Sequence, residues 1–184
     1  MENISVKYIQ QIDSLRNQLK ELEDFEGITE EDNFNGFIQL LGFEAELYID
    51  IEFKKTGAKI IVCPPAVPFT KDLLIEMNDF NAMTNFKVFY FERYLNFVVP
   101  EFEISEECLL DIISIKLANL LTNEMFLDLM RKYLKFYECP KCGCIVELIY
   151  PYDSQDYVYE CNGCGERFSI KEITGIEDYI DEYK

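Results

Sequence analysis

Four cysteines near the end of the chain have the spacing that most clearly indicates chemistry. They form two C-x-x-C pairs separated by 18 residues: Cys139 and Cys142, then Cys161 and Cys164. Two such pairs about 15–20 residues apart are typical of a zinc site with four cysteine ligands. Gly143 and Gly165 directly follow the pairs, where a tight turn around a metal needs a positive φ. The spacing therefore predicts one Zn2+ held by these four thiolates.

The segment from about 137 to 171 resembles a zinc ribbon, and the sequences CPKCG and CNGCG carry the resemblance. Apolar runs predict a hairpin with strands at 145–150 and 157–161 around a turn at 151–155. Residues 167–170 can add a third strand. Zinc ribbons serve nucleic-acid, protein and purely structural roles, so the motif by itself predicts the metal and not the function.

The expected role of this metal is structural. Four thiolates complete a tetrahedron and leave no position for water or substrate, and a doubly negative centre is a poor Lewis acid. An iron cluster is the alternative metal centre. Cys144 lies two residues beyond Cys142 and is interpreted as a spare thiol whose side chain points off the first strand of the ribbon.

The rest of the chain lacks the residues of common catalytic sites. It has no histidine, which excludes Ser-His-Asp and Cys-His nucleophile pairs. It also has no phosphate-binding glycine loop and no G-x-S-x-G turn. Cys63 and Cys108 are lone thiols in apolar stretches, expected to be buried and unreactive. We therefore expect no catalytic residues and no enzyme activity, with a carboxylate-only hydrolase as the remaining enzymatic alternative.

The composition of the 184-residue chain restricts its partners. Lys plus Arg number 17 and Asp plus Glu number 35, a net charge of −18. Apolar residues make up 49% of the chain, enough for a real core. Phosphate backbones and anionic lipids bind cations, so we expect no direct contact with nucleic acid or membrane. No apolar run approaches the roughly 18 residues of a membrane helix. Thiolate metal sites suit a reducing compartment, which predicts a cytoplasmic protein.

The first half of the chain predicts one helix and two strands. An amphipathic helix is expected within residues 1–24, with the apolar stripe Tyr8, Ile12, Leu15, Leu19 and Leu22. Strict alternation over 43–53 predicts a strand with one apolar face and one solvated acidic face carrying Glu44, Glu46, Asp50 and Glu52. A turn leads to a second strand at 58–63, which the following prolines end.

The next segment predicts a helix and a hairpin. Thr70 can cap a helix over about 71–81. Strands are expected at 86–92 and 95–99, joined at Arg93 and Tyr94 and closed by Pro100.

A long helical stretch follows, and it completes the expected fold. It is expected to run from a cap at Ser105 to about Tyr137, with a break near Thr122–Asn123 because it exceeds the usual helix length. The predicted fold class is α+β. Helices pack on an antiparallel sheet in the order α-β-β-α-β-β-α, and a small C-terminal zinc ribbon follows. The predicted domains are 1–135 and 136–184.

The N-terminal region resembles the YbjN-like and type III secretion chaperone-like fold. The residues that carry the resemblance are LLIEMNDFN, leading into FKVFYFERYLNFVVPEFEIS and then ECLLDIISIKLANLL. The resemblance implies small acidic proteins, often dimeric, that bind extended segments of other proteins along the sheet and helices. An attached zinc ribbon departs from the ordinary pattern of that family.

Together these features favour a non-enzymatic, protein-binding adaptor or chaperone whose partner is another protein. Homodimerisation is left open. The alternative is an acidic inhibitor that mimics nucleic acid on a host or phage enzyme through its row of carboxylates. Four tyrosines of the ribbon hairpin have two interpretations, packing of a small sheet or a protein contact surface: Tyr150, Tyr152, Tyr157 and Tyr159.

Overall fold

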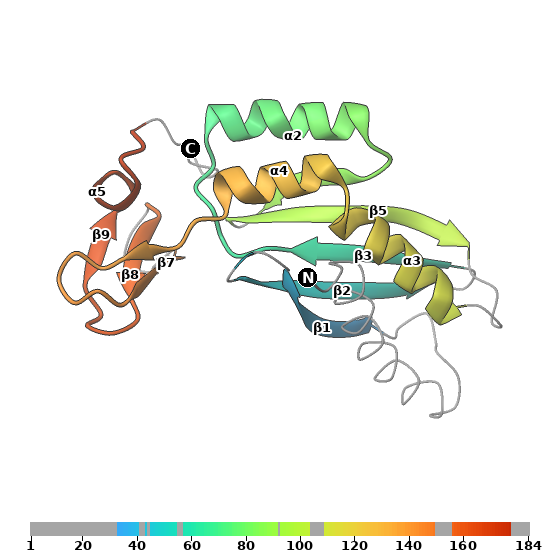
Figure 1. Ribbon diagram of the computed structural model, residues 1–184, viewed down its shortest axis with the longest axis horizontal. Coiled ribbons are helices and arrows are strands. Elements are labelled where there is room, and N and C mark those ends of the chain that lie inside the picture. The colour runs from blue at the N-terminus through green and yellow to red at the C-terminus, as the bar shows by residue number, and fades with distance from the viewer. Residues whose placement is uncertain are drawn as a thin grey trace, which may run out of the picture.

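The computed structural model describes residues 33–40, 43, 45–54, 57–91, 93–103, 109–149 and 156–177. The expected N-terminal helix, the cap at Ser105 and the turn at 151–155 lie outside these residues, as do Glu44, Cys108, Tyr150 and Tyr152. The described residues form two antiparallel sheets and four helices (Figure 1). None of the described helices is long and apolar enough to span a membrane.

The larger sheet has five strands in the order β1-β2-β3-β5-β4, and every neighbouring pair is antiparallel. The strands are β1 (Asn33–Leu40), β2 (Ala45–Lys54), β3 (Gly57–Cys63), β4 (Lys87–Phe91) and β5 (Tyr94–Glu103). The alternation predicted from the sequence holds in β2, where Leu47, Ile49 and Ile51 are fully buried and Glu46 before them is exposed.

Three helices cover one face of this sheet (Figure 1): α2 (Lys71–Met83), α3 (Leu109–Leu121) and α4 (Glu124–Tyr133). Aromatic contacts join the helices to the sheet. The ring of Phe97 on β5 meets Phe80 of α2 edge-on at 5.4 Å and Phe126 of α4 at 4.8 Å, and all three side chains are fully buried. Such pairs add about 0.5–1.5 kcal/mol each to the burial of their area.

Two helix boundaries predicted from the sequence are confirmed. The hydroxyl of Thr70 accepts the N–H of Leu73 at 3.1 Å and starts α2. Asn123 accepts the N–H of Phe126 at 3.1 Å, so the long helical stretch breaks where its length suggested. Its end was predicted too late, because α4 stops at Tyr133.

Strand β1 was not predicted, so the order α-β-β-α-β-β-α is wrong in the described region, which reads β-β-β-α-β-β-α-α. The polar run before Gly36 suggested a loop. Pairing with β2 along its whole length overrides that weak local preference, and it buries Ile38 and Leu40.

Pro100 does not close β5, as the sequence suggested. Val99 pairs with Ile60 and Phe102 pairs with Ala58, so residues 100–101 stand opposite the single residue Lys59. This bulge lets the strand continue to Glu103, because a bulged residue does not need to donate a ladder hydrogen bond.

The smaller sheet and one short helix form a unit that we call the cysteine module, comprising the described residues from 137 to 177. Its strands follow the order β6-β7-β8-β9. They are β6 (Tyr137–Glu138), β7 (Ile145–Ile149), β8 (Val158–Cys161) and β9 (Arg167–Ser169), followed by α5 (Ile170–Thr174). Tyr157 and Tyr159 are buried inside it, at 5% and 4% exposure, which favours the packing interpretation for these two tyrosines.

The free edge of the larger sheet at β4 is capped by a side chain. The amide of Asn81 on α2 accepts the N–H of Val88 at 2.7 Å and donates to its carbonyl at 2.9 Å. Asn81 thus satisfies the outward backbone groups of Val88, which would otherwise pair with an added strand. Edge strands protected in this way resist aggregation.

We expect Asn81→Ala to lower the free energy of unfolding by about 1–3 kcal/mol, because it removes two hydrogen bonds to backbone groups of the edge strand. It should also promote concentration-dependent self-association. Asn78→Ala, at an exposed position of the same helix, is the matched control. Urea unfolding and sedimentation velocity measure the two effects. Equal unfolding curves for the two variants would contradict the capping role.

Candidate functional site

The two C-x-x-C pairs form matching turns. In each, the N–H of the first cysteine donates to the carbonyl five residues later, at 2.7 Å for Cys139 and 2.9 Å for Cys161. The glycine after each pair donates to the carbonyl of that first cysteine at 2.9 Å in both turns. Gly143 and Gly165 have φ of 73° and 69°, as the sequence predicted. Both turns therefore present their cysteines in the same way.

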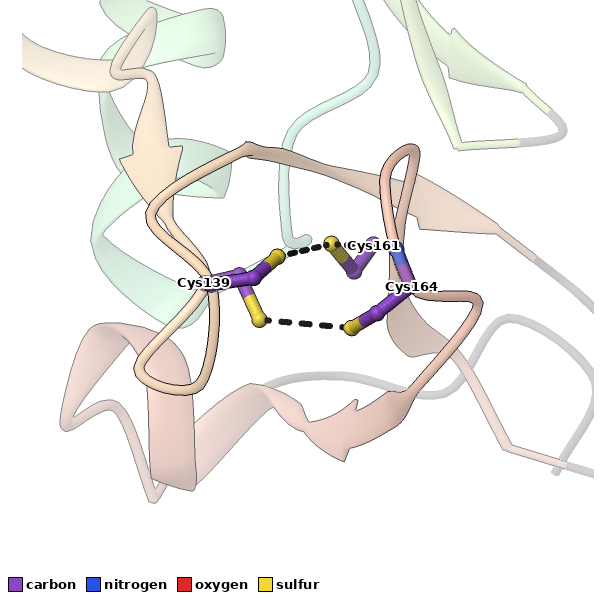
Figure 2. Close-up of side chains that lie close together, drawn as sticks. Cys139, Cys161 and Cys164 are labelled. Atoms are coloured by element: carbon purple, nitrogen blue, oxygen red, sulfur yellow. Dashed lines mark hydrogen bonds between the residues drawn. The ribbon is translucent and has the colours of Figure 1, made fainter.

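The turns bring four sulfur atoms within 4.8 Å of one another, from Cys139, Cys142, Cys161 and Cys164. Figure 2 shows the side chains of the first and the last two of these cysteines converging. The sulfurs of Cys139 and Cys164 are 3.8 Å apart, and those of Cys142 and Cys161 are 3.4 Å apart. Tetrahedral metal–sulfur bonds of about 2.3 Å separate sulfurs by about 3.8 Å. The arrangement could therefore hold one metal ion.

Backbone amides stabilise the thiolate form of one of these cysteines, Cys161. The sulfur of Cys161 accepts the N–H groups of Cys164 at 3.4 Å and Gly163 at 3.3 Å. These bonds, with Cys164 contributing most, lower the pKa of Cys161 to about 6. The thiolate is the form that binds metal, so this turn would favour ligation of a metal ion by Cys161.

Cys144 follows the first turn, and its side chain lies beside Gly163 of the second turn. A Cβ atom added to Gly163 would lie 2.5 Å from the sulfur of Cys144. The exposed side chain of Cys144 thus packs against the second turn, and Gly163 has no Cβ that would block it. Cys144 is not a member of the four-sulfur cluster.

The cysteine module has a small core. Among the described residues its buried cluster has eight members: Cys139, Val146, Leu148, Tyr157, Tyr159, Cys161, Phe168 and Ile170. An ion pair between Lys141 and Glu166 (2.5 Å) joins the two turns, but both side chains are about half exposed. Exposed pairs contribute only about 0–1 kcal/mol. A metal bound by four thiolates would therefore supply much of the folding free energy of the module.

A second candidate site lies on the face of the larger sheet that the helices leave uncovered. One row of side chains crosses all five strands there, as the strand register shows: Phe37, Tyr48, Cys63, Asn96 and Phe89. At one end of this face is a groove of about 750 Å³, which we call the aromatic groove. It is lined by Phe37, Ala45, Glu46, Tyr48, Cys63, Pro64, Pro65, Phe91, Tyr94, Asn96 and Phe136.

Three phenylalanines of the aromatic groove are unusually exposed. Phe37 is 67% exposed, Phe91 58% and Phe136 44%. They come from β1, β4 and the linker before β6, far apart in sequence. Sequence reasoning missed them because a single exposed aromatic residue carries no pattern. The density of aromatic residues within 86–91 was the one available signal.

The thiol inside the aromatic groove is not reactive. Cys63 donates a hydrogen bond to the Asn96 side-chain oxygen at 3.2 Å. Burial, with a smaller contribution from the charge of Asp50, raises the pKa of Cys63 to about 11. The thiol therefore stays protonated at neutral pH, in agreement with the expectation of an unreactive cysteine, although it is half-buried and not fully buried.

The predicted acidic row on β2 is only partly solvated. Glu46 is exposed, whereas Glu52 pairs with Lys59 at 3.2 Å. Asp50 is half-buried, and its Oδ1 atom is buried with no hydrogen-bond partner among the residues that the structure describes. Burial, followed by the charge of Glu52, raises the pKa of Asp50.

No protein-family model matches the chain, and comparison with curated proteins and with solved structures found no match.

Replacing Cys161 with Ser should release the metal and unfold the cysteine module, while α2 and α4 remain folded. Cys144→Ser is the matched control and should keep the metal, because its sulfur is outside the cluster. Metal content per chain and NMR signals of the module measure both effects. Full metal content in the Cys161→Ser protein would disprove the ligand set.

Asp50→Asn should raise the free energy of unfolding at pH 7. The raised pKa means that ionisation of Asp50 costs more in the folded than in the unfolded chain, so stability falls as pH rises through the folded-state pKa. The gain should shrink as pH falls towards about 4, the ordinary pKa of an aspartate, because the folded-state carboxyl then takes up its proton. Urea unfolding between pH 4 and 7 measures it, with Glu46→Gln on the same strand as control. A gain that does not depend on pH would refute this account.

Proposed function

We propose that this chain is a non-enzymatic adaptor or chaperone that binds a segment of another protein in the aromatic groove. The observation that carries the proposal is the set of exposed phenylalanines that line one groove, Phe37, Phe91 and Phe136. Exposed aromatic residues gathered in a hollow mark interaction sites, because each ring buries a large apolar area at a low entropic cost.

The form of the sheet supports binding on its face rather than at its β4 edge. Asn81 occupies the outward backbone groups of Val88, so a partner strand cannot pair there without displacing it. The aromatic groove lies instead across the ends of several strands, where side chains provide the contacts. A partner segment would thus bury rings without extending the β4 edge.

We further propose that the cysteine module is a zinc ribbon in which Zn2+ is structural. Four thiolates fill a tetrahedron, which leaves the ion no open position for chemistry. The module also borders the aromatic groove. Phe136 lies between Leu134, which is buried in the larger core, and Tyr137, which packs against the core of the module. The metal would hold the module together and so fix the groove wall that carries Phe136.

The resemblance to YbjN-like and type III secretion chaperone-like proteins is consistent with this role, since it implies binding of extended protein segments on an acidic α+β domain. Residues 1–135 would form the binding domain and residues 136–184 the ribbon. The protein would act in the cytoplasm, where its thiolates remain reduced.

The alternative role, an acidic mimic of nucleic acid, receives less support from the side chains. Mimicry needs a row of free carboxylates. Of the described members of the row, Glu52 is paired with Lys59 and Asp50 is half-buried with a raised pKa, which leaves Glu46 as the exposed one.

The proposal predicts that random dodecapeptides displayed on phage will yield binders whose affinity depends on the aromatic groove. Phe91→Ser should weaken their binding about tenfold, because fully burying one such side chain contributes about 1.5–3 kcal/mol. Ile75→Ser on α2 is the matched control, since Ile75 is also 58% exposed but lies on a helix outside the groove. Fluorescence anisotropy of the selected peptides measures the affinity.

Unfolding curves of both variants should match that of the unmodified protein, which separates lost binding from lost folding. A library that yields no binder, or binders that Phe91→Ser leaves unaffected, would overturn the proposed function.

A further inference from the structure

Among the described residues, the polar side chains that line the aromatic groove are paired with one another or with neighbours, with one exception. Cys63 donates to Asn96, and the Asn96 amide donates to the Tyr94 carbonyl at 3.0 Å. The Tyr48 hydroxyl donates to Asn35 at 2.8 Å. These groups gain little from a ligand, because their hydrogen bonds are already made within the chain.

The Tyr94 hydroxyl is likewise engaged. It accepts a hydrogen bond from the Arg93 guanidinium at 3.2 Å, and that guanidinium lies 5.2 Å from the centre of the Tyr94 ring. Arg93, in the turn between β4 and β5, is therefore already engaged by Tyr94. The contact also shows that an aromatic ring at this edge of the groove accepts a guanidinium.

Glu46 is the exception. Its side chain is exposed on β2 and lines the aromatic groove. Within the part of the chain that the structure describes, no lysine or arginine forms an ion pair with it. The facing residue of β1, Gln39, donates its amide to the carbonyls of Phe43 and Ala45 instead. Glu46 is thus the charged group that a bound segment would meet.

We infer that the aromatic groove receives a segment in which an arginine or lysine side chain lies among apolar residues. The inference rests on the proposed function and specifies the chemistry of its partner. The apolar residues would bury the exposed phenylalanines, and the cation would pair with Glu46 while its stem or guanidinium packs on the rings. A cation over an aromatic face favours binding even at an exposed site.

The negative charge of the chain also favours a basic segment over a second copy of the chain as the occupant of the aromatic groove. Each copy carries a net charge of −18, so two copies repel each other, most strongly at low ionic strength. An acidic segment would place a carboxylate beside Glu46, which is unfavourable for the same reason. A basic segment is instead attracted by the whole molecule and steered towards it at low ionic strength.

The test uses the peptides selected on the full chain from random dodecapeptides. Lysine and arginine should be enriched among them relative to the unselected library. Glu46→Gln should weaken their binding about threefold to fivefold, as expected for one exposed ion pair, and raising the salt concentration should weaken binding to the unmodified protein. Replacing the selected basic residue with norleucine should remove both effects.

The control is Asp79→Asn, which makes the same charge change on an exposed position of α2 outside the groove. It should leave the affinity within error of the unmodified protein. Equal losses in the Glu46→Gln and Asp79→Asn proteins would overturn the inference, because net charge and not the groove would then govern binding.

The remaining outcomes separate the inference from the proposed function. Binders that depend on Phe91 but show no basic enrichment and no loss with Glu46→Gln would overturn the inference and leave the proposed function intact. Self-association that Phe91→Ser abolishes, measured by sedimentation, would identify a second copy as the occupant and overturn the inference. Peptides that bind independently of Phe91 would overturn both.

Discussion

The structure depends on burying one face of the five-stranded sheet under three helices. Side chains of a strand alternate between its two faces, so a fixed register that buries Leu47, Ile49 and Ile51 also decides what lies opposite. Phe97 ties the sheet to α2 and α4 through two edge-on ring contacts. Once that face is filled, the residues between the buried ones must form the uncovered face. The aromatic groove is the direct consequence of this constraint.

The cysteine module differs from the larger domain in what can stabilise it. The eight buried residues among those described form a small core, so a metal held by the two matching turns would add much of the stability of the module. Its contact with the larger domain is specific, because Ala66 packs against the small core and Phe136 joins the two units. In our proposal the metal therefore supports binding without taking part in any chemistry.

Sequence patterns predicted the features that depend on neighbours along the chain. The positive φ of Gly143 and Gly165, the helix start at Thr70, the helix break at Asn123 and the alternation of β2 were all predicted correctly. Patterns failed where a distant partner overrode local preference. Strand β1 exists because β2 pairs with it, and Pro100 is accommodated because a bulge faces Lys59. The neighbour of Cys144 was likewise not predictable from a local pattern, since it is Gly163 of the other turn.

The sequence by itself determined the four-cysteine spacing, the acidic charge, the absence of histidine and most helix and strand positions, because these follow from composition and from periods of two to four residues. Only the tertiary structure decided that Phe37, Phe91 and Phe136 share one groove and that Glu46 is the charged group in it. It also decided that Asp50 is half-buried and that Glu52 pairs with Lys59. The physical reason is that strand order and register bring together residues that no local pattern connects.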